Sequence, residues 1–233
     1  MGARSITPII IIQARMNSKR LPGKVMMDWC GKPMLSWILE RLEDCKASKN
    51  IIVATSKDPV NHPIREFCKR NRFGCYSGEE NNVLKRFVDA AEVYKSDVVI
   101  RLTGDNPFVN HELVDHVYSS FEKYYPRFDY VSNVDHQSTP IGLYVEIIKL
   151  SALKDALSEA TADELEHVTL KIRNNKKKHR TLNVSSPFPV TNFSFTVDLP
   201  TDRSRLLPVF DHLRSNSENF SLDNIRCFLE TVE

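Results

Sequence analysis

Four cationic side chains directly follow an apolar run near the start of the chain. Residues 9–24 read IIIIQARMNSKRLPGK and carry Arg15, Lys19, Arg20 and Lys24. Arginine gives bidentate hydrogen bonds to phosphate oxygens, and lysine adds a point charge. Because the apolar run favours burial while the cations favour water or an anion, the pattern indicates a buried strand that ends at a site for negative charge.

The loop that carries these cations is not a glycine-rich phosphate loop. It matches neither G-x-x-x-x-G-K-[ST] nor G-x-G-x-x-G, and Gly23 is its one glycine. We expect the LPG of residues 21–23 to turn the chain so that Lys24 points back at the site. Side-chain charge, rather than backbone amides, would then bind a phosphate. A solvated basic loop is an equally good interpretation of the residues alone.

Two aspartates stand where strands are expected to end. Asp105 lies in RLTGDNPF, where Gly104 allows a close approach of the backbone, and Asp198 lies in FTVDLPTD. Mg²⁺ prefers one or two carboxylates, completed by phosphate and water oxygens. Each aspartate alone is equally well explained as a turn former or helix cap. Their joint position beside a cationic loop favours a metal-bound polyphosphate.

The elements that would position these residues alternate between strand and helix through the first half of the chain. Hydrophobic patterning predicts strands at residues 9–13, 50–56, 75–77 and 97–105. It predicts helices at residues 34–45, 64–70, 83–94 and 111–123. This alternation is typical of an α/β fold with a mainly parallel twisted sheet flanked by helices. Ligands of such sheets bind beyond the carboxyl ends of the strands, where the basic loop would lie.

The second half is less regular. Strands are expected at residues 129–133, 142–148 and 192–199, and helices at 150–157, 162–175 and 221–232, with Ser221 as N-cap. No linker or repeat divides the 233 residues, so we predict a single domain over residues 1–233.

Composition narrows the class of protein. The chain is 41% hydrophobic and 27% charged with a net charge of +2, which argues against a general nucleic-acid or membrane binder. Five cysteines without a C-x-x-C pair favour free thiols in a reducing cytoplasm. We therefore expect a cytoplasmic protein with no nucleic-acid partner and no membrane partner.

Several segments together resemble one known family. The motifs QARMNSKRLPGK, GKPMLSWILERL, VATS, RLTGDNPF, DYVSN, PIGLYVE, EHV and TVDLPTD occur here in the order seen in cytidylyltransferases. The chain looks most like the spore-coat polysaccharide biosynthesis branch. It is more distantly similar to the synthetases of CMP-activated 3-deoxy-manno-octulosonate and sialic-type acids. The resemblance extends from residue 9 to residue 202.

The resemblance implies a fold, a reaction and a set of site residues. The fold would be that of nucleotide-diphospho-sugar transferases (glycosyltransferase A-like). The reaction would transfer CMP from CTP to a sugar, expected to be acidic, and release pyrophosphate for surface polysaccharide biosynthesis. Catalysis would rest on Arg15, Arg20, Lys24 and Asp105. The nucleotide would also contact Gln13, Ala14, Ser18, Ser77 and Gly78, and Mg²⁺ would be bound by Asp105 and Asp198.

Other implied positions concern the loop and the acceptor. Many relatives have a small residue where this chain has Asn17, so the loop is expected to lie less close to the phosphates. Residues 8–125 would bind the nucleotide, and residues 126–233 the substrate and a second subunit of a homodimer. Glu146 would contact sugar hydroxyls or face solvent. Glu166 and His167 would contact the substrate or the dimer partner, and packing is the plainer interpretation of His167.

Other functions remain open. The runner-up is a nucleotidyltransferase that uses another NTP, or a glycosyltransferase that consumes a nucleotide sugar, because the same fold supports both. A different class is suggested by residues 171–180, KIRNNKKKHR, a basic stretch that could bind RNA or anionic surfaces. It lacks interleaved aromatic residues and any nucleic-acid motif, and a solvated helix end explains it at least as well.

Overall fold

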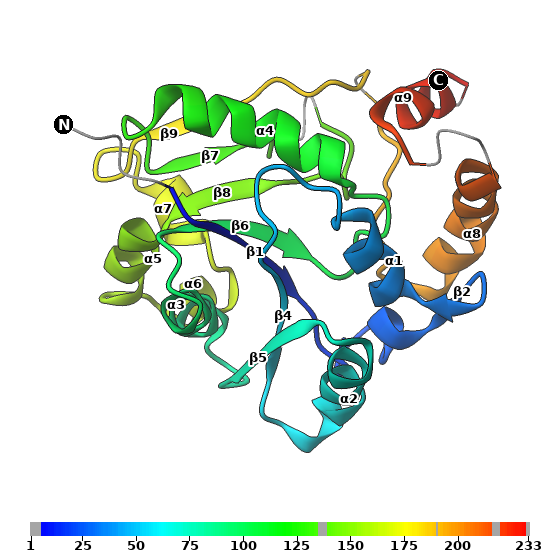
Figure 1. The fold of residues 1–233 in the computed structure, drawn as a ribbon, viewed down its shortest axis with the longest axis horizontal. Coiled ribbons are helices and arrows are strands. Elements are labelled where there is room, and N and C mark those ends of the chain that lie inside the picture. Colours follow the sequence, from blue (N-terminus) through cyan, green and yellow to red (C-terminus); the bar gives the residue numbers. More distant parts are fainter. Residues whose placement is uncertain (1–5, 135–138, 190, 216–219, 232–233) are drawn as a thin grey trace.

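A seven-stranded sheet forms the centre of the computed structural model, which describes residues 6–134, 139–189, 191–215 and 220–231 (Figure 1). The strand order is β5-β4-β1-β6-β8-β7-β9. The bounds are β1 Pro8–Gln13, β4 Ile51–Ser56, β5 Gly74–Gly78, β6 Val98–Thr103, β7 Tyr130–Ser132, β8 Glu146–Lys149 and β9 Thr181–Asn183. β5, β4, β1 and β6 are parallel, and β8 runs antiparallel to β6 and β7. The predicted mainly parallel α/β sheet is confirmed.

The four consecutive isoleucines of β1 are explained by burial on both faces of the sheet. Ile9, Ile10, Ile11 and Ile12 have no exposed surface. Ile10 and Ile12 pack with α1 (Met34–Arg41), α2 (His62–Asn71) and α4 (His111–Tyr124). Ile9 and Ile11 pack with α3 (Val83–Val93), α5 (Leu150–Leu157) and α7 (Leu170–Asn174). A central parallel strand therefore needs an unbroken apolar run.

The remaining elements lie around this core (Figure 1). They are η1 Lys24–Met26, the hairpin of β2 Asp28–Trp29 and β3 Lys32–Pro33, η2 Pro59–Asn61, α6 Ala162–Glu166, α8 Pro200–Ser215 and α9 Leu222–Glu230. Phe210 of α8 packs edge-on against Trp29 and Trp37, which attaches α8 to α1 and the hairpin. Ser221 caps α9 by accepting a hydrogen bond from the backbone of Asn224, as predicted, while residue 232 lies outside the described residues.

Three predictions for the second half are wrong. Residues 192–199 form no strand and have one isolated β-bridge, between Ser194 and Ile141, although Phe195 and Val197 are buried. The helix expected over 162–175 is broken into α6 and α7 around His167, whose backbone is not helical. The strand expected from residue 142 begins at Glu146, because Gly142 has a φ of 94°, in the left-handed region. β9 and α8 are additions that the patterning did not show.

Both halves of the chain contribute strands to the one sheet, since β7, β8 and β9 follow residue 126. The division into a nucleotide part and a substrate part stays a prediction. Within the described ranges, no helix combines the length and apolarity that crossing a membrane requires.

The sheet register brings two loops together. Gln13 at the end of β1 pairs with Thr103 at the end of β6. Beyond them, the amide of Gly104 donates a hydrogen bond of 2.8 Å to the carbonyl oxygen of Gln13. A Cβ atom at position 104 would lie only 3.0 Å from that oxygen, so this close approach needs glycine, as expected. The basic loop and the Asp105 segment therefore leave the sheet side by side.

Candidate active site

A cavity of about 390 Å³ opens at the carboxyl ends of β1 and β6. Most of the side chains predicted for the site line it, namely Gln13, Ala14, Arg15, Ser18, Arg20, Lys24, Asp105, Glu166, His167 and Asp198. Ser77, Gly78 and Glu146 are not part of this lining. The roles of all these residues stay predictions, but the structure brings the basic loop and both aspartates to one place.

The basic loop is closed by its own backbone. Gly23 has a φ of 75°, and its amide donates a hydrogen bond of 2.7 Å to the carbonyl oxygen of Met16. Position 23 therefore favours glycine, because L-residues rarely adopt a positive φ. The chain then enters η1 at Lys24, whose side chain faces the cavity. The predicted turn over residues 21–23 is confirmed.

The Lys24 ammonium lies between the two aspartates. Its Nζ is 2.8 Å from Oδ2 of Asp105, 2.9 Å from Oδ1 of Asp198 and 2.8 Å from the carbonyl oxygen of Val197. Lys24 is 7% exposed. Asp198 comes from an irregular segment, held because the Val197 amide donates to the Asp105 carbonyl oxygen at 2.9 Å. One buried cation thus gathers oxygens from two distant segments.

The two arginines of the loop are also paired with acids. Arg20 binds the second carboxylate oxygen of Asp198 at 2.6 Å, and Arg15 binds Glu166 at 2.8 Å. Around the whole cavity, five cations face three acids, which leaves a net charge of +2 when His167 is neutral. The cavity therefore attracts anions, and an anion that enters can take over cations now held by carboxylates.

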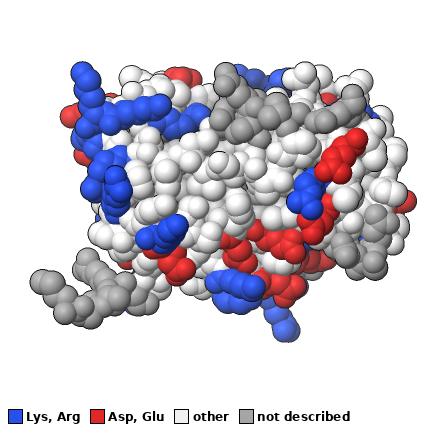
Figure 2. Space-filling model, turned by 90° about the horizontal axis from the view of Figure 1, so that it is seen from above, with Lys and Arg blue, Asp and Glu red and all other residues white. Residues whose placement is uncertain are grey.

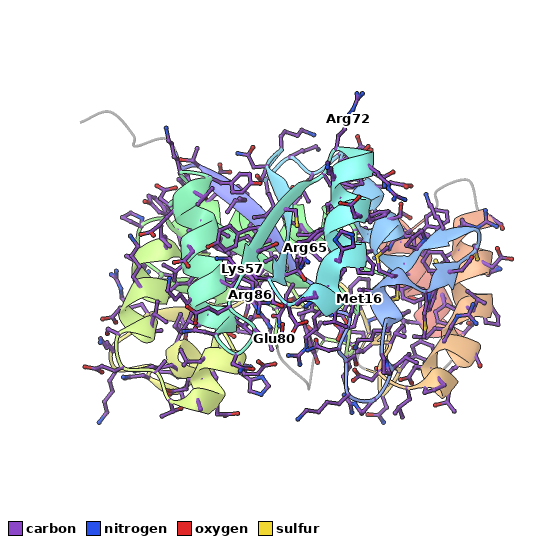
Figure 3. The ribbon with its side chains drawn as sticks, turned by 90° about the horizontal axis from the view of Figure 1, so that it is seen from below. Met16, Lys57, Arg65, Arg72, Glu80 and Arg86 are labelled. Carbon is purple, nitrogen blue, oxygen red and sulfur yellow. The ribbon has the colours of Figure 1, made fainter. Side chains whose placement is uncertain are left out.

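A hydrogen-bonded network behind the cavity supports the loop. Asn17 donates to Glu80 at 2.6 Å, and the Met16 amide donates to the buried side chain of Asn61 at 2.7 Å. Arg86 of α3 in turn donates to the carbonyl oxygens of Glu79 and Glu80. Figure 3 shows Glu80 and Arg86 in the space between α2 and α3. The SGEENNVLKRF segment thus contacts the loop through Glu80 rather than through Ser77 or Gly78, and Asn17 serves as that link.

A second cavity of about 230 Å³ adjoins the first and shares Arg101, Thr103 and His167 with it. Glu146 lines this second cavity and is 4% exposed, so of the two alternatives the one in which it faces solvent is wrong, while a contact with sugar hydroxyls stays a prediction. It forms an ion pair with Arg101 and accepts hydrogen bonds from Tyr130 at 2.7 Å and Thr169 at 2.6 Å.

The pKa of Glu146 reflects two opposing effects. Burial raises the pKa of this carboxyl, but the Arg101 charge and the Thr169 and Tyr130 hydrogen bonds outweigh burial and place it below its usual value. The charged carboxylate is thus the form that the structure stabilises.

Arg173 also lines the second cavity. Its Nε is buried, and among the described residues it has no hydrogen-bond partner. The Arg173 charge helps to lower the pKa of Glu146, but the hydrogen bonds of that carboxylate come from Arg101, Tyr130 and Thr169. The second cavity is therefore lined by a cationic side chain with one N–H group that has no partner among the described residues.

The basic stretch of residues 171–180 is largely paired with acids on the surface. Lys178 binds Asp155 at 2.8 Å, Arg180 lies 3.4 Å from Asp129, and Lys171 lies 3.8 Å from Glu159. On the face seen in Figure 2, Lys and Arg are most numerous toward the left end, and Asp and Glu gather in the lower and right parts with further Lys and Arg among them. This visible face carries both signs of charge and differs from the continuous basic face typical of nucleic-acid binding.

Two site residues were not recognised from the sequence. Arg101 interrupts the apolar run of β6, and a lone cation inside a buried strand is the signal that could have identified it. Arg173 stands in a basic stretch with several exposed lysines, so no pattern distinguished it.

The aspartates provide a plausible donor set for a divalent cation. Both approach the same point, since each lies within 2.9 Å of the Lys24 ammonium. Over the residues described, no group of three or more His, Cys, Asp or Glu side chains forms a complete metal site. A magnesium ion here would need phosphate or water oxygens, which is its usual coordination with nucleotides. The residues present therefore fit Mg²⁺ that is bound together with a phosphate ligand.

Comparison with known proteins shows the family to which the chain belongs. The cytidylyltransferase family model matches residues 9–226. The chain is 34% identical over 202 residues to the spore coat polysaccharide biosynthesis protein SpsF of Bacillus subtilis, covering 83% of this chain and 82% of that protein. It is 34% identical over 108 residues to a 3-deoxy-manno-octulosonate cytidylyltransferase of Colwellia psychrerythraea, covering 43% of this chain and 36% of that protein.

A solved structure extends the comparison to the fold. A cytidylyltransferase from Leptospira borgpetersenii superposes with a TM-score of 0.90 at 28% identity, covering 97% of this chain and 95% of that chain. The expected nucleotide-diphospho-sugar transferase fold is thereby confirmed. From its sequence and its fold alike, this chain belongs to the cytidylyltransferase family.

Proposed function

We propose that this protein transfers CMP from CTP to an acidic sugar, with release of pyrophosphate, for the synthesis of a surface polysaccharide. The observation on which this proposal rests is that one cavity is lined by two cations and two aspartates that pair with one another, namely Arg20, Lys24, Asp105 and Asp198. Membership of the cytidylyltransferase family supports CTP as the nucleotide. The similarity to a spore coat polysaccharide biosynthesis protein supports a role in the synthesis of a surface polysaccharide.

Charge balance supports a magnesium-bound triphosphate. A nucleoside triphosphate carries roughly four negative charges near neutral pH. The cavity lining supplies a net charge of at most +2, since Arg101 is also paired with Glu146 of the second cavity, so at least half of the ligand charge stays unbalanced. A divalent cation at Asp105 and Asp198 would reduce this imbalance. When bound, it would polarise the α-phosphate and lower the pKa of the attacking hydroxyl.

The protein side chains would act by positioning and by neutralising charge. A sugar hydroxyl attacks the α-phosphorus in line, the bond to the pyrophosphate oxygen breaks, and no covalent intermediate with the protein is needed. Arg15, Arg20 and Lys24 would bind the departing pyrophosphate as its charge grows. Gln13 and Ala14 line the cavity at the end of β1 and would contact the base.

The second cavity supports an acidic acceptor. It adjoins the nucleotide cavity at Arg101, Thr103 and His167, so an acceptor bound there would lie within reach of the α-phosphate. Arg173 has the buried, unpaired Nε described above, and a carboxylate is its natural partner.

We expect Arg173→Met to raise the KM for an acidic acceptor about 10- to 100-fold, because one charge-assisted interaction is lost. The value of kcat should change much less. Steady-state pyrophosphate release measures both constants. Lys176→Met is the control, since it removes the same charge from the segment after α7 and should leave KM unchanged. Equal KM values for the two variants, or equal use of neutral and acidic sugars, would argue against an acidic acceptor.

Nucleotide choice provides a separate test. With Mg²⁺ and a panel of sugars, we expect pyrophosphate release from CTP to exceed that from UTP, ATP or GTP by at least about tenfold. Release from another NTP instead would favour the runner-up nucleotidyltransferase. Release of a nucleoside phosphate from a nucleotide sugar, without pyrophosphate, would favour a glycosyltransferase.

We also propose a cytoplasmic homodimer. All five cysteines are unpaired, which suits a reducing compartment. Light scattering during size-exclusion chromatography would test the dimer.

A further inference from the structure

The Lys24 ammonium uses the oxygens that a divalent cation would need. Its Nζ contacts one carboxylate oxygen of Asp105, one of Asp198 and the carbonyl oxygen of Val197, all at 2.8 to 2.9 Å. An ammonium group has three N–H donors, so all of its donors are occupied. Carboxylate and carbonyl oxygens are also the preferred ligands of Mg²⁺ and Ca²⁺. Lys24 and a metal ion would therefore compete for the same position.

Simultaneous occupancy is unfavourable for electrostatic reasons. A divalent cation at these oxygens would lie within a few ångströms of a buried positive charge, where solvent screens poorly. Lys24 is 7% exposed and faces the cavity, so bulk water around the protein offers it little compensation. The ammonium can move away from the aspartates only if another anion in the cavity accepts it. Phosphate groups of a nucleotide are such anions.

We infer that Lys24 excludes divalent cations from Asp105 and Asp198 until a nucleotide is bound. The inference rests on the proposed magnesium site and adds an order of events to it. The metal enters together with the nucleotide, and Lys24 exchanges its two carboxylates for phosphate oxygens. Arg20 follows the same exchange, because its partner is the other oxygen of Asp198. In the protein without metal and nucleotide, the Lys24 ammonium thus takes the place of the metal ion between Asp105 and Asp198.

Binding of Mn²⁺ alone, followed by the electron paramagnetic resonance signal of the free ion, tests the inference without turnover. Removing the ammonium should free the carboxylates, so Lys24→Met should bind Mn²⁺ at least about tenfold more tightly than wild type. Lys19→Met is the matched control. Lys19 lines the same cavity, but among the described residues no hydrogen bond or ion pair joins it to either aspartate. The Mn²⁺ affinity of Lys19→Met should therefore stay within about threefold of wild type.

Two further variants secure the interpretation. Adding Asp105→Asn to Lys24→Met should abolish the gain, because one of the two carboxylates is removed. Circular dichroism establishes that each variant is folded, and Lys24→Gln, which keeps a hydrogen-bond donor, replaces Lys24→Met if that variant does not fold. A folded Lys24 variant that binds Mn²⁺ no better than Lys19→Met would overturn the inference. So would a gain that survives Asp105→Asn.

Failure of this inference is distinguishable from failure of the proposed function. If wild type releases pyrophosphate from CTP but the Lys24 variants gain no Mn²⁺ affinity, only the exclusion by Lys24 is wrong. If the Lys24 variants gain affinity while wild type releases no pyrophosphate from any NTP, the exclusion stands and the proposed reaction is wrong.

Discussion

Asp105→Asn is expected to lower kcat for CTP-dependent pyrophosphate release by at least about 10²-fold, by analogy with the loss of a fixed electrostatic contact at a reacting centre. Asparagine has nearly the same shape, and its side-chain oxygen can still accept a hydrogen bond from Lys24. The variant therefore removes mainly one negative charge from a site where two carboxylates meet at one cation. Coupled pyrophosphate detection with saturating Mg²⁺ and CTP gives the measurement.

Asp211→Asn is the matched control for this experiment. Asp211 is an exposed aspartate of α8 that is also paired with a cation, Arg214 at 2.7 Å, but it does not line the cavity that contains Asp105. The pyrophosphate-release activity of Asp211→Asn should equal that of wild type. Near-normal turnover of folded Asp105→Asn would show that the metal assignment is wrong.

The second large effect concerns stability. Arg101→Met leaves Glu146 buried without its cation, and breaking such a pair lowers the free energy of unfolding by about 3–5 kcal/mol. Because the Arg101 side chain is 17% exposed, we expect the lower end of that range. Urea denaturation at neutral pH, followed by circular dichroism, gives the difference.

The pH dependence of this variant has a defined sign. In wild type the pKa of Glu146 is lowered, so its contribution to stability is present above the unfolded-state pKa of about 4.3 and is lost as the pH falls through the folded value. Burial is already the largest single influence on this pKa, and without the Arg101 charge to oppose it we expect the pKa of Glu146 to rise. Protonation then relieves the unpaired charge, so the deficit of Arg101→Met should be smaller near pH ~5 than near pH ~7.

A double variant separates charge from packing. Adding Glu146→Gln to Arg101→Met removes the unpaired carboxylate while keeping a hydrogen-bonding side chain for Tyr130 and Thr169. It should recover at least about 1 kcal/mol of the loss at neutral pH. If the double variant is no more stable than the single one, the loss arises from packing of the Arg101 side chain and not from the buried charge.

The N-terminal part of the site was the most predictable from the sequence. Local patterns determine β1, the turn at Gly23 and the close approach at Gly104, so the basic loop and Asp105 could be placed beside one another. Asp198 was assigned to the rim of a strand that does not exist. Its position instead depends on long-range hydrogen bonds of the 197–198 segment to Lys24 and Asp105, which no periodicity reports.

The C-terminal elements were less predictable for specific physical reasons. α8 contains Pro208 and buries only a few side chains, among them Leu206, Phe210 and Leu213, so its apolar pattern is weak and proline argues against a helix. Phe195 and Val197 alternate like strand residues because they pack into the core on one side, yet their backbone joins no ladder. The alternation of buried and exposed side chains in this segment therefore predicted a strand that the backbone does not form.

The late position of Asp198 has a consequence for synthesis on the ribosome. The strands β1, β4, β5 and β6 emerge first and can form their parallel ladder while the rest of the chain is still being made. During that interval Arg20 and Lys24 lack the carboxylate that later holds them both. Until residue 198 has been made, Arg20 therefore lacks its carboxylate partner and Lys24 can pair only with Asp105, so the growing polypeptide presents a basic loop that is only partly neutralised.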